Sequence, residues 1–170
     1  MAGQAVTAGW LPAGLADVGA WGLLALCLAC AVATDLRERR IGNRLVACGL
    51  GAALAVALWR VAEPGGPGLD AAIGGWVGGL MLGGLLLLPL HLLGGMAAGD
   101  VKLMAMSGAF LGPGLAWQAA LGSLVAGGVL ALGWLAWHAA RRLVAPRRYP
   151  YAPAIAVGCA FALARQGAGA

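Results

Sequence analysis

The chain has 170 residues, of which 62% are hydrophobic and only 10% are charged. In a soluble domain roughly a quarter of all residues are charged. The much lower charged fraction of this chain excludes a soluble protein and predicts a membrane protein. The net charge of +5 does not indicate nucleic-acid binding, because the basic residues lie in short clusters beside apolar runs. Cys27 and Cys30 form a C-x-x-C inside an apolar run without a second pair nearby, so we expect buried packing and no zinc site.

Apolar segments in chain order predict an all-α, polytopic membrane protein with one domain, residues 1–170. A spanning helix needs about 20 apolar residues. Six predicted helices cover residues 16–34, 45–62, 71–93, 100–111, 115–140 and 152–164, of which the fourth and sixth are short for a full span. Loop signals separate them at residues 63–68 and 112–114. In the third helix, the glycine pairs 74/78 and 75/79 are spaced four apart, which predicts a helix-packing face.

The basic residues predict the orientation in the membrane. If six helices cross the membrane alternately, nine basic residues fall on one side of it: Arg37, Arg39, Arg40, Arg44, Lys102, Arg141, Arg142, Arg147 and Arg148. Only Arg60 and Arg165 fall on the other side. Because cytoplasmic loops are enriched in Lys and Arg, we expect the first side to be cytoplasmic and both termini to lie outside.

Two aspartates lie where predicted helices meet the cytoplasm. Asp35 directly follows the first apolar run, and Asp100 directly precedes the fourth. Ionisable groups at membrane depth are costly and usually face the interior of the bundle. Two neighbouring carboxyls share a proton, and such a pair can hydrolyse a peptide bond because one activates water while the other polarises the carbonyl. The aspartates themselves leave open the alternative that both are helix caps beside lipid headgroups.

The residues around these aspartates resemble a known family. Residues 34–43 read TDLRERRIGN, residues 94–103 read GGMAAGDVKL, and residues 149–158 read YPYAPAIAVG. In this order they resemble the prepilin peptidases, the membrane aspartic proteases that process type IV pilin precursors. That family has an Asp followed by a basic stretch and I-P-N, then G-x-G-D-x-K-[LF], then P-[YF]-x-P-[AS]-I-x-x-G. Gly42 replaces the proline, and Ala97 replaces the first motif glycine, where alanine does not easily adopt a positive φ.

The resemblance implies an aspartic endopeptidase of the bacterial cytoplasmic (inner) membrane with Asp35 and Asp100 as catalytic residues. Its substrate would be a pilin or pseudopilin precursor, whose short leader is removed at the cytoplasmic face. Membrane lipid and pilus assembly machinery are the other expected partners, and no metal or cofactor is expected. The supporting motif residues would be Gly99, Lys102, Arg40, Asn43, Pro150, Tyr151 and Pro153.

We expect no N-terminal cysteine-rich domain of the kind that long family members carry, because the chain has neither the length nor the cysteines for one. It therefore resembles the short, peptidase-only form of tight-adherence (Flp-type) pilus systems, without methyltransferase activity. Two rival functions stay open: an inactive membrane scaffold of a pilus machine, and a proton-coupled transporter. A transporter would place its acids nearer to the middle of the membrane, within discontinuous helices.

The sequence also predicts roles for the two aspartates and for the residues near them. Asp100 begins a helix, where the positive end of the helix dipole favours an ionised carboxylate. Asp35 ends a helix, where the negative end of the dipole favours the protonated form. We therefore expect Asp100 to act as the base and Asp35 as the acid. Lys102 is two residues from Asp100, so its side chain should extend to the headgroups rather than to that carboxyl. We expect Asn43 to cap the second helix and His91 to pack at the interface.

Overall fold

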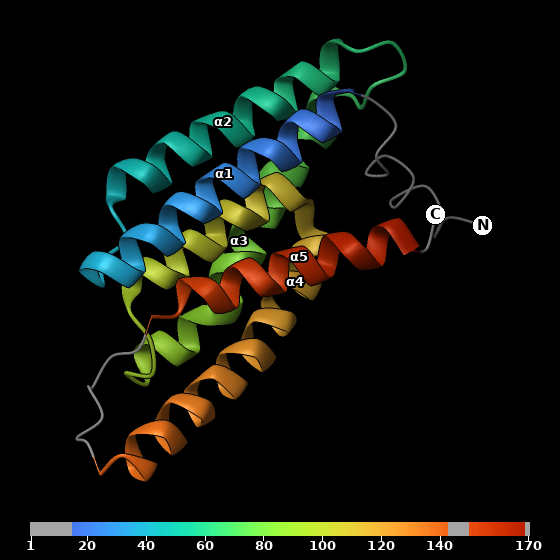
Figure 1. Ribbon diagram of the computed structural model, residues 1–170. Helices are drawn as coiled ribbons and strands as arrows, with labels where there is room; N and C mark the ends of the chain where they lie inside the picture. The colour runs from blue at the N-terminus through green and yellow to red at the C-terminus, as the bar shows by residue number, and fades with distance from the viewer. Residues whose placement is uncertain (1–14, 143–149, 169–170) are drawn as a thin grey trace.

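The computed structural model describes residues 15–142 and 150–168, in which the regular structure is entirely helical. The helices are α1 (Leu15–Glu38), α2 (Asn43–Ala62), α3 (Leu69–Leu92), α4 (Ala98–Ala140) and α5 (Ala152–Ala168), as shown in Figure 1. The predicted all-α class is confirmed. Of the described helices, the four from α1 to α4 are long and apolar enough to cross a membrane.

The helix α4 reverses its direction at Gly112, which has φ 72° and ψ 170°. In a straight helix, residues 104 and 123 would lie roughly 28 Å apart at 1.5 Å per residue. Instead, Oγ of Ser123 lies 3.9 Å from Sδ of Met104. Residues 98–111 and 113–140 are therefore two antiparallel halves, drawn in yellow and orange in Figure 1. Pro113 follows the break, at the start of a helix, where a missing N–H costs little.

These halves correspond to the predicted fourth and fifth helices, which meet where the sequence predicted a loop. The predicted number of six spans is not confirmed, since four of the described helices are long and apolar enough to cross a membrane. The first half of α4 rises only about 20 Å, which is shorter than the ~30 Å core of a bilayer. The predicted position of the termini also stays a prediction, because residues 1–14 and 169–170 lie outside the described part of the chain.

Glycines bring α3 against the first half of α4. A Cβ added to Gly79 would overlap the carbonyl oxygen of Gly108, and one added to Gly83 would lie 2.6 Å from the carbonyl oxygen of Met104. Small residues allow this close approach of two backbones within a membrane. The buried face of α3 contains Gly75, Gly79 and Gly83, whereas Gly74 has open space around it. Of the two predicted glycine pairs, 75/79 is therefore the main packing pair.

The helix α5 returns through the bundle between α1 and the second half of α4. Cys159 of α5 is buried in the core beside Leu24 and Leu28 of α1. The prediction of buried cysteines in α1 is wrong for Cys30, which is exposed, and Cys27 is half-buried. The reason is that α1 presents one side to the bundle and the opposite side outward. This packing brings the start of α5 to the same end of the bundle as the last turn of α1.

Candidate active site

The two predicted aspartates come together at one end of the helical bundle. Asp35 lies in the last turn of α1, and Asp100 is the third residue of α4. Each is only 6% exposed, and the two carboxyl groups interact electrostatically. Both carboxyls are therefore buried at the same end of the bundle, near enough for the charge of one to act on the other.

Asp100 is held by the start of its own helix. The backbone N–H of Ala97 donates a hydrogen bond of 3.2 Å to Oδ2 of Asp100, which caps α4. Ala97 is the N-cap residue and has φ −78° and ψ 150°, an extended conformation that alanine adopts without strain. The positive φ in this loop belongs to Gly94. Replacing the motif glycine with Ala97 is thus compatible with the observed loop.

Asp35 is held by a different helix from its own. The backbone N–H of Ala152, the first residue of α5, donates a hydrogen bond of 3.0 Å to Oδ2 of Asp35. The first N–H groups of a helix have no partner within the helix, and its N-terminus carries partial positive charge. The expected position of Asp35 near the negative end of α1 is observed, but the N-terminus of α5 also packs against this carboxyl. Both carboxyls lie at helix N-termini, so helix dipoles do not distinguish an acid from a base.

The loop between α1 and α2 packs on the start of α4. A Cβ added to Gly99 would lie 3.2 Å from Cβ of Ile41, so a side chain at Gly99 would press on this loop. Nζ of Lys102 donates a hydrogen bond of 3.0 Å to Oδ1 of Asn43. The expected cap at Asn43 is wrong, because the N-cap of α2 is Gly42, without a side-chain hydrogen bond, and Asn43 instead accepts this bond from Lys102. Lys102 is exposed and bonds Asn43 rather than Asp100, and its expected extension to the headgroups stays a prediction.

The predicted third motif forms the start of α5. Tyr151 is buried, and its hydroxyl donates a hydrogen bond of 2.9 Å to the backbone oxygen of Ser123 in α4. Pro153 is the second residue of α5, where a proline removes no helical hydrogen bond. Pro150 and Tyr151 directly precede Ala152. This motif therefore orients the N–H that binds the first aspartate.

His91, for which the sequence indicated interface packing, lies beside the loop that precedes Asp100. Its Nδ1–H donates a hydrogen bond of 3.0 Å to the carbonyl oxygen of Met96. His91 thus ties the end of α3 to the loop before α4. A polar residue near a helix end was the only available signal in the sequence. Arg40 lies in the α1–α2 loop with an exposed side chain. Arg147, Arg148 and Tyr149 lie outside the described residues.

The fold and the site define a helical membrane protein with two buried, interacting carboxyls at one end of its bundle. The model of the type IV leader peptidase family matches residues 22–132, a region that includes both aspartates. The chain belongs to the type IV leader peptidase family, which identifies it as a protease of this type. No curated protein and no solved structure matches the chain significantly. The third motif, at residues 149–158, lies beyond the region that the family model matches.

Proposed function

We propose that this protein is an aspartic endopeptidase of the bacterial cytoplasmic membrane, with Asp35 and Asp100 as its catalytic pair. The observation that carries the proposal is the burial of these two carboxyls at the same end of the bundle, although they are 65 positions apart in the sequence. Its substrates are type IV pilin-like precursors, from which it removes a short basic leader.

The mechanism uses the pair as a unit with one shared proton. The ionised carboxylate takes a proton from water, and the resulting hydroxide attacks the carbonyl carbon of the scissile bond. The protonated carboxyl gives its proton to the carbonyl oxygen. A second proton transfer to the amide nitrogen then breaks the C–N bond and yields a carboxylic acid and an amine. Each aspartate is held through Oδ2 by a backbone N–H, which fixes its orientation.

The charges support cleavage at the cytoplasmic face. The pair shares its end of the bundle with Arg37 in the last turn of α1 and with Arg39 and Arg40 in the loop that follows. Arg60 lies in the last turn of α2, at the opposite end. An excess of Lys and Arg is typical of cytoplasmic loops. The scaffold alternative depended on a distorted loop at Ala97, and the relaxed dihedral angles of Ala97 weigh against it. The position of both acids at one end weighs against a transporter.

Co-expression with pilin-like precursors tests the proposal. We expect the mass of the precursor to fall by that of its leader with the wild type, and to stay unchanged with Asp35→Asn or Asp100→Asn. Asp70→Asn is the matched control, because Asp70 is an exposed acid in the first turn of α3, away from the pair. Wild-type processing by either variant of the pair would refute the proposed mechanism.

A further inference from the structure

An apolar groove of about 570 Å³ runs between α1 and α5. On α1 it extends from Trp21 to Leu36, and on α5 from Ala156 to Leu163, and every residue that lines it is uncharged. At 1.5 Å per residue, the stretch of α1 rises about 22 Å. The groove is therefore long enough for about 15 residues of a further helix.

Small residues make this groove suitable for a helix. Ala25, Ala29 and Ala33 line it at intervals of four on α1, and Ala156 and Ala160 do the same on α5. Their side chains are exposed or half-buried, while Leu24, Leu28 and Cys159 form a buried floor beside them. Small residues at intervals of four let helices approach closely in a membrane, where contact and shape drive association. An apolar helix could thus pack on α1 and α5 together.

One end of the groove lies beside Asp35. Leu36, which lines the groove, directly follows Asp35. On the opposite wall, Ala156 lies one turn after Ala152, whose N–H binds Asp35. The hydrogen bond between Asp35 and Ala152 therefore joins the two walls at this end. A helix in the groove would begin at the first catalytic carboxyl.

We propose that this groove binds the apolar helix of the precursor, with the start of that helix at Asp35 and its leader beyond. The inference rests on the proposed function and adds the surface that recognises the substrate. A leader peptidase must place the bond between the leader and the apolar helix at its catalytic pair. The groove meets this requirement because it is apolar along its length and ends at the carboxyl that α1 supplies.

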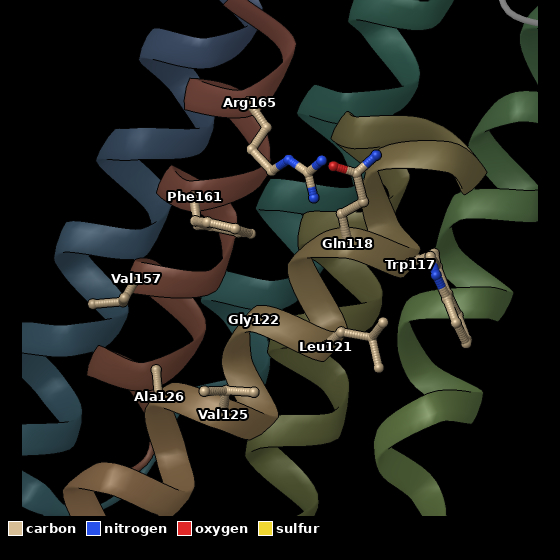
Figure 2. Close-up of a pocket in the computed structure, with 9 residues that line it drawn as sticks. All are labelled: Trp117, Gln118, Leu121, Gly122, Val125, Ala126, Val157, Phe161 and Arg165. Carbon is tan, nitrogen blue, oxygen red and sulfur yellow. The ribbon is translucent and has the colours of Figure 1, made fainter. Parts of the chain in front are cut away.

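A second cavity, on another side of α5, does not have these properties. It has a volume of about 440 Å³ and lies between α5 and the second half of α4, as Figure 2 shows. The side chains of Arg165 and Gln118 point toward each other at one end of it. A guanidinium group in a cavity favours a polar or anionic group over an apolar helix. No residue of α1 lines this cavity, so it provides control positions for an experiment.

Photocrosslinking of the full chain in membranes tests the groove directly. A benzoylphenylalanine is introduced at Ala29 or Ala160 in the groove, at Val125 in the second cavity, or at Ala55, which is exposed on α2. The precursor is supplied in the Asp100→Asn background, so that it is not consumed. We expect adducts with the apolar helix of the precursor at Ala29 and Ala160, at several times the yield at Val125 and Ala55. Equal yields at all positions, or adducts with lipid alone in the groove, would overturn the proposal.

Filling the groove gives a second readout. Ala29 is exposed, so Ala29→Trp should occupy the groove without overpacking the core, and we expect KM for the precursor to rise at least tenfold at unchanged Tm. Ala55→Trp is the matched control and should process the precursor at the wild-type rate. Wild-type kinetics of Ala29→Trp would contradict the groove. Crosslinks in the groove without cleavage by the wild type would refute the proposed function alone, and cleavage without these crosslinks would refute the groove alone.

Discussion

Two substitutions of Asp35 separate its proposed chemistry from its structural contact. The carboxyl accepts the N–H of Ala152 at 3.0 Å in a buried environment. Asp35→Asn keeps an oxygen that can accept this hydrogen bond, whereas Asp35→Ala removes the acceptor. Leaving a buried donor without this partner costs about 1–3 kcal/mol. Only the alanine variant should therefore lose stability.

Both variants should lose activity to a similar extent. General acid–base catalysis contributes about 10²- to 10⁴-fold, so we expect the rate of precursor cleavage to fall at least ~100-fold in each. For a chain of this size, 1 kcal/mol corresponds to about 2–4 °C in Tm, so Asp35→Ala should lower Tm by about 2–12 °C. Cleavage is followed by mass spectrometry, and Tm is measured on the purified proteins in one detergent.

The two measurements can fail separately. An equal fall of Tm in Asp35→Asn and Asp35→Ala would show that the bond to Ala152 does not explain the stability of this end of the bundle. Cleavage at the wild-type rate by Asp35→Asn would refute the role of the carboxyl itself. Asp70→Asn, in an exposed position, should change neither quantity.

Three further predictions concern packing and loops, each measured as the free energy of unfolding in detergent. Gly79→Ala places a Cβ on the carbonyl of Gly108, so we expect the free energy of unfolding to fall by about 1–3 kcal/mol. Gly74→Ala has open space, so helix propensity should raise the free energy of unfolding by up to about 1 kcal/mol. Equal effects of the two variants would contradict the observed packing face. Gly42 has φ −68°, a value that proline adopts, so Gly42→Pro should stabilise the protein by about 0.4–1 kcal/mol, and a loss would contradict this backbone conformation. Tyr151→Phe removes the 2.9 Å hydrogen bond to α4, so we expect the free energy of unfolding to fall by about 0.5–1.5 kcal/mol. Cleavage should also be slower, because the start of α5 is held less firmly. An unchanged free energy of unfolding would count against this contact.

The sequence predicted the helices well because apolar length is a local property. Each predicted helix overlaps a described helical segment, and the break predicted at residues 112–114 is where Gly112 leaves the helical conformation. The reversal of α4 could not be predicted as a close hairpin, since it depends on contacts such as that between Met104 and Ser123. Likewise, the glycine spacing indicated a packing face, but only the position of α4 decides which glycines are buried.

Asp35 and Asp100, the pair from which the candidate site is built, could be identified from sequence because each is an acid beside an apolar run within a recognisable motif. The sequence alone thus determined the membrane class, the approximate helices and the two candidate carboxyls. Only the tertiary structure decided their surroundings, because the N–H that binds Asp35 is 117 positions away in the chain. Because of that contact, helix dipoles no longer assign the base role to Asp100 and the acid role to Asp35. The electric field at a buried carboxyl includes every helix end packed against it. It also placed an apolar groove beside the pair, which no local pattern of residues could show.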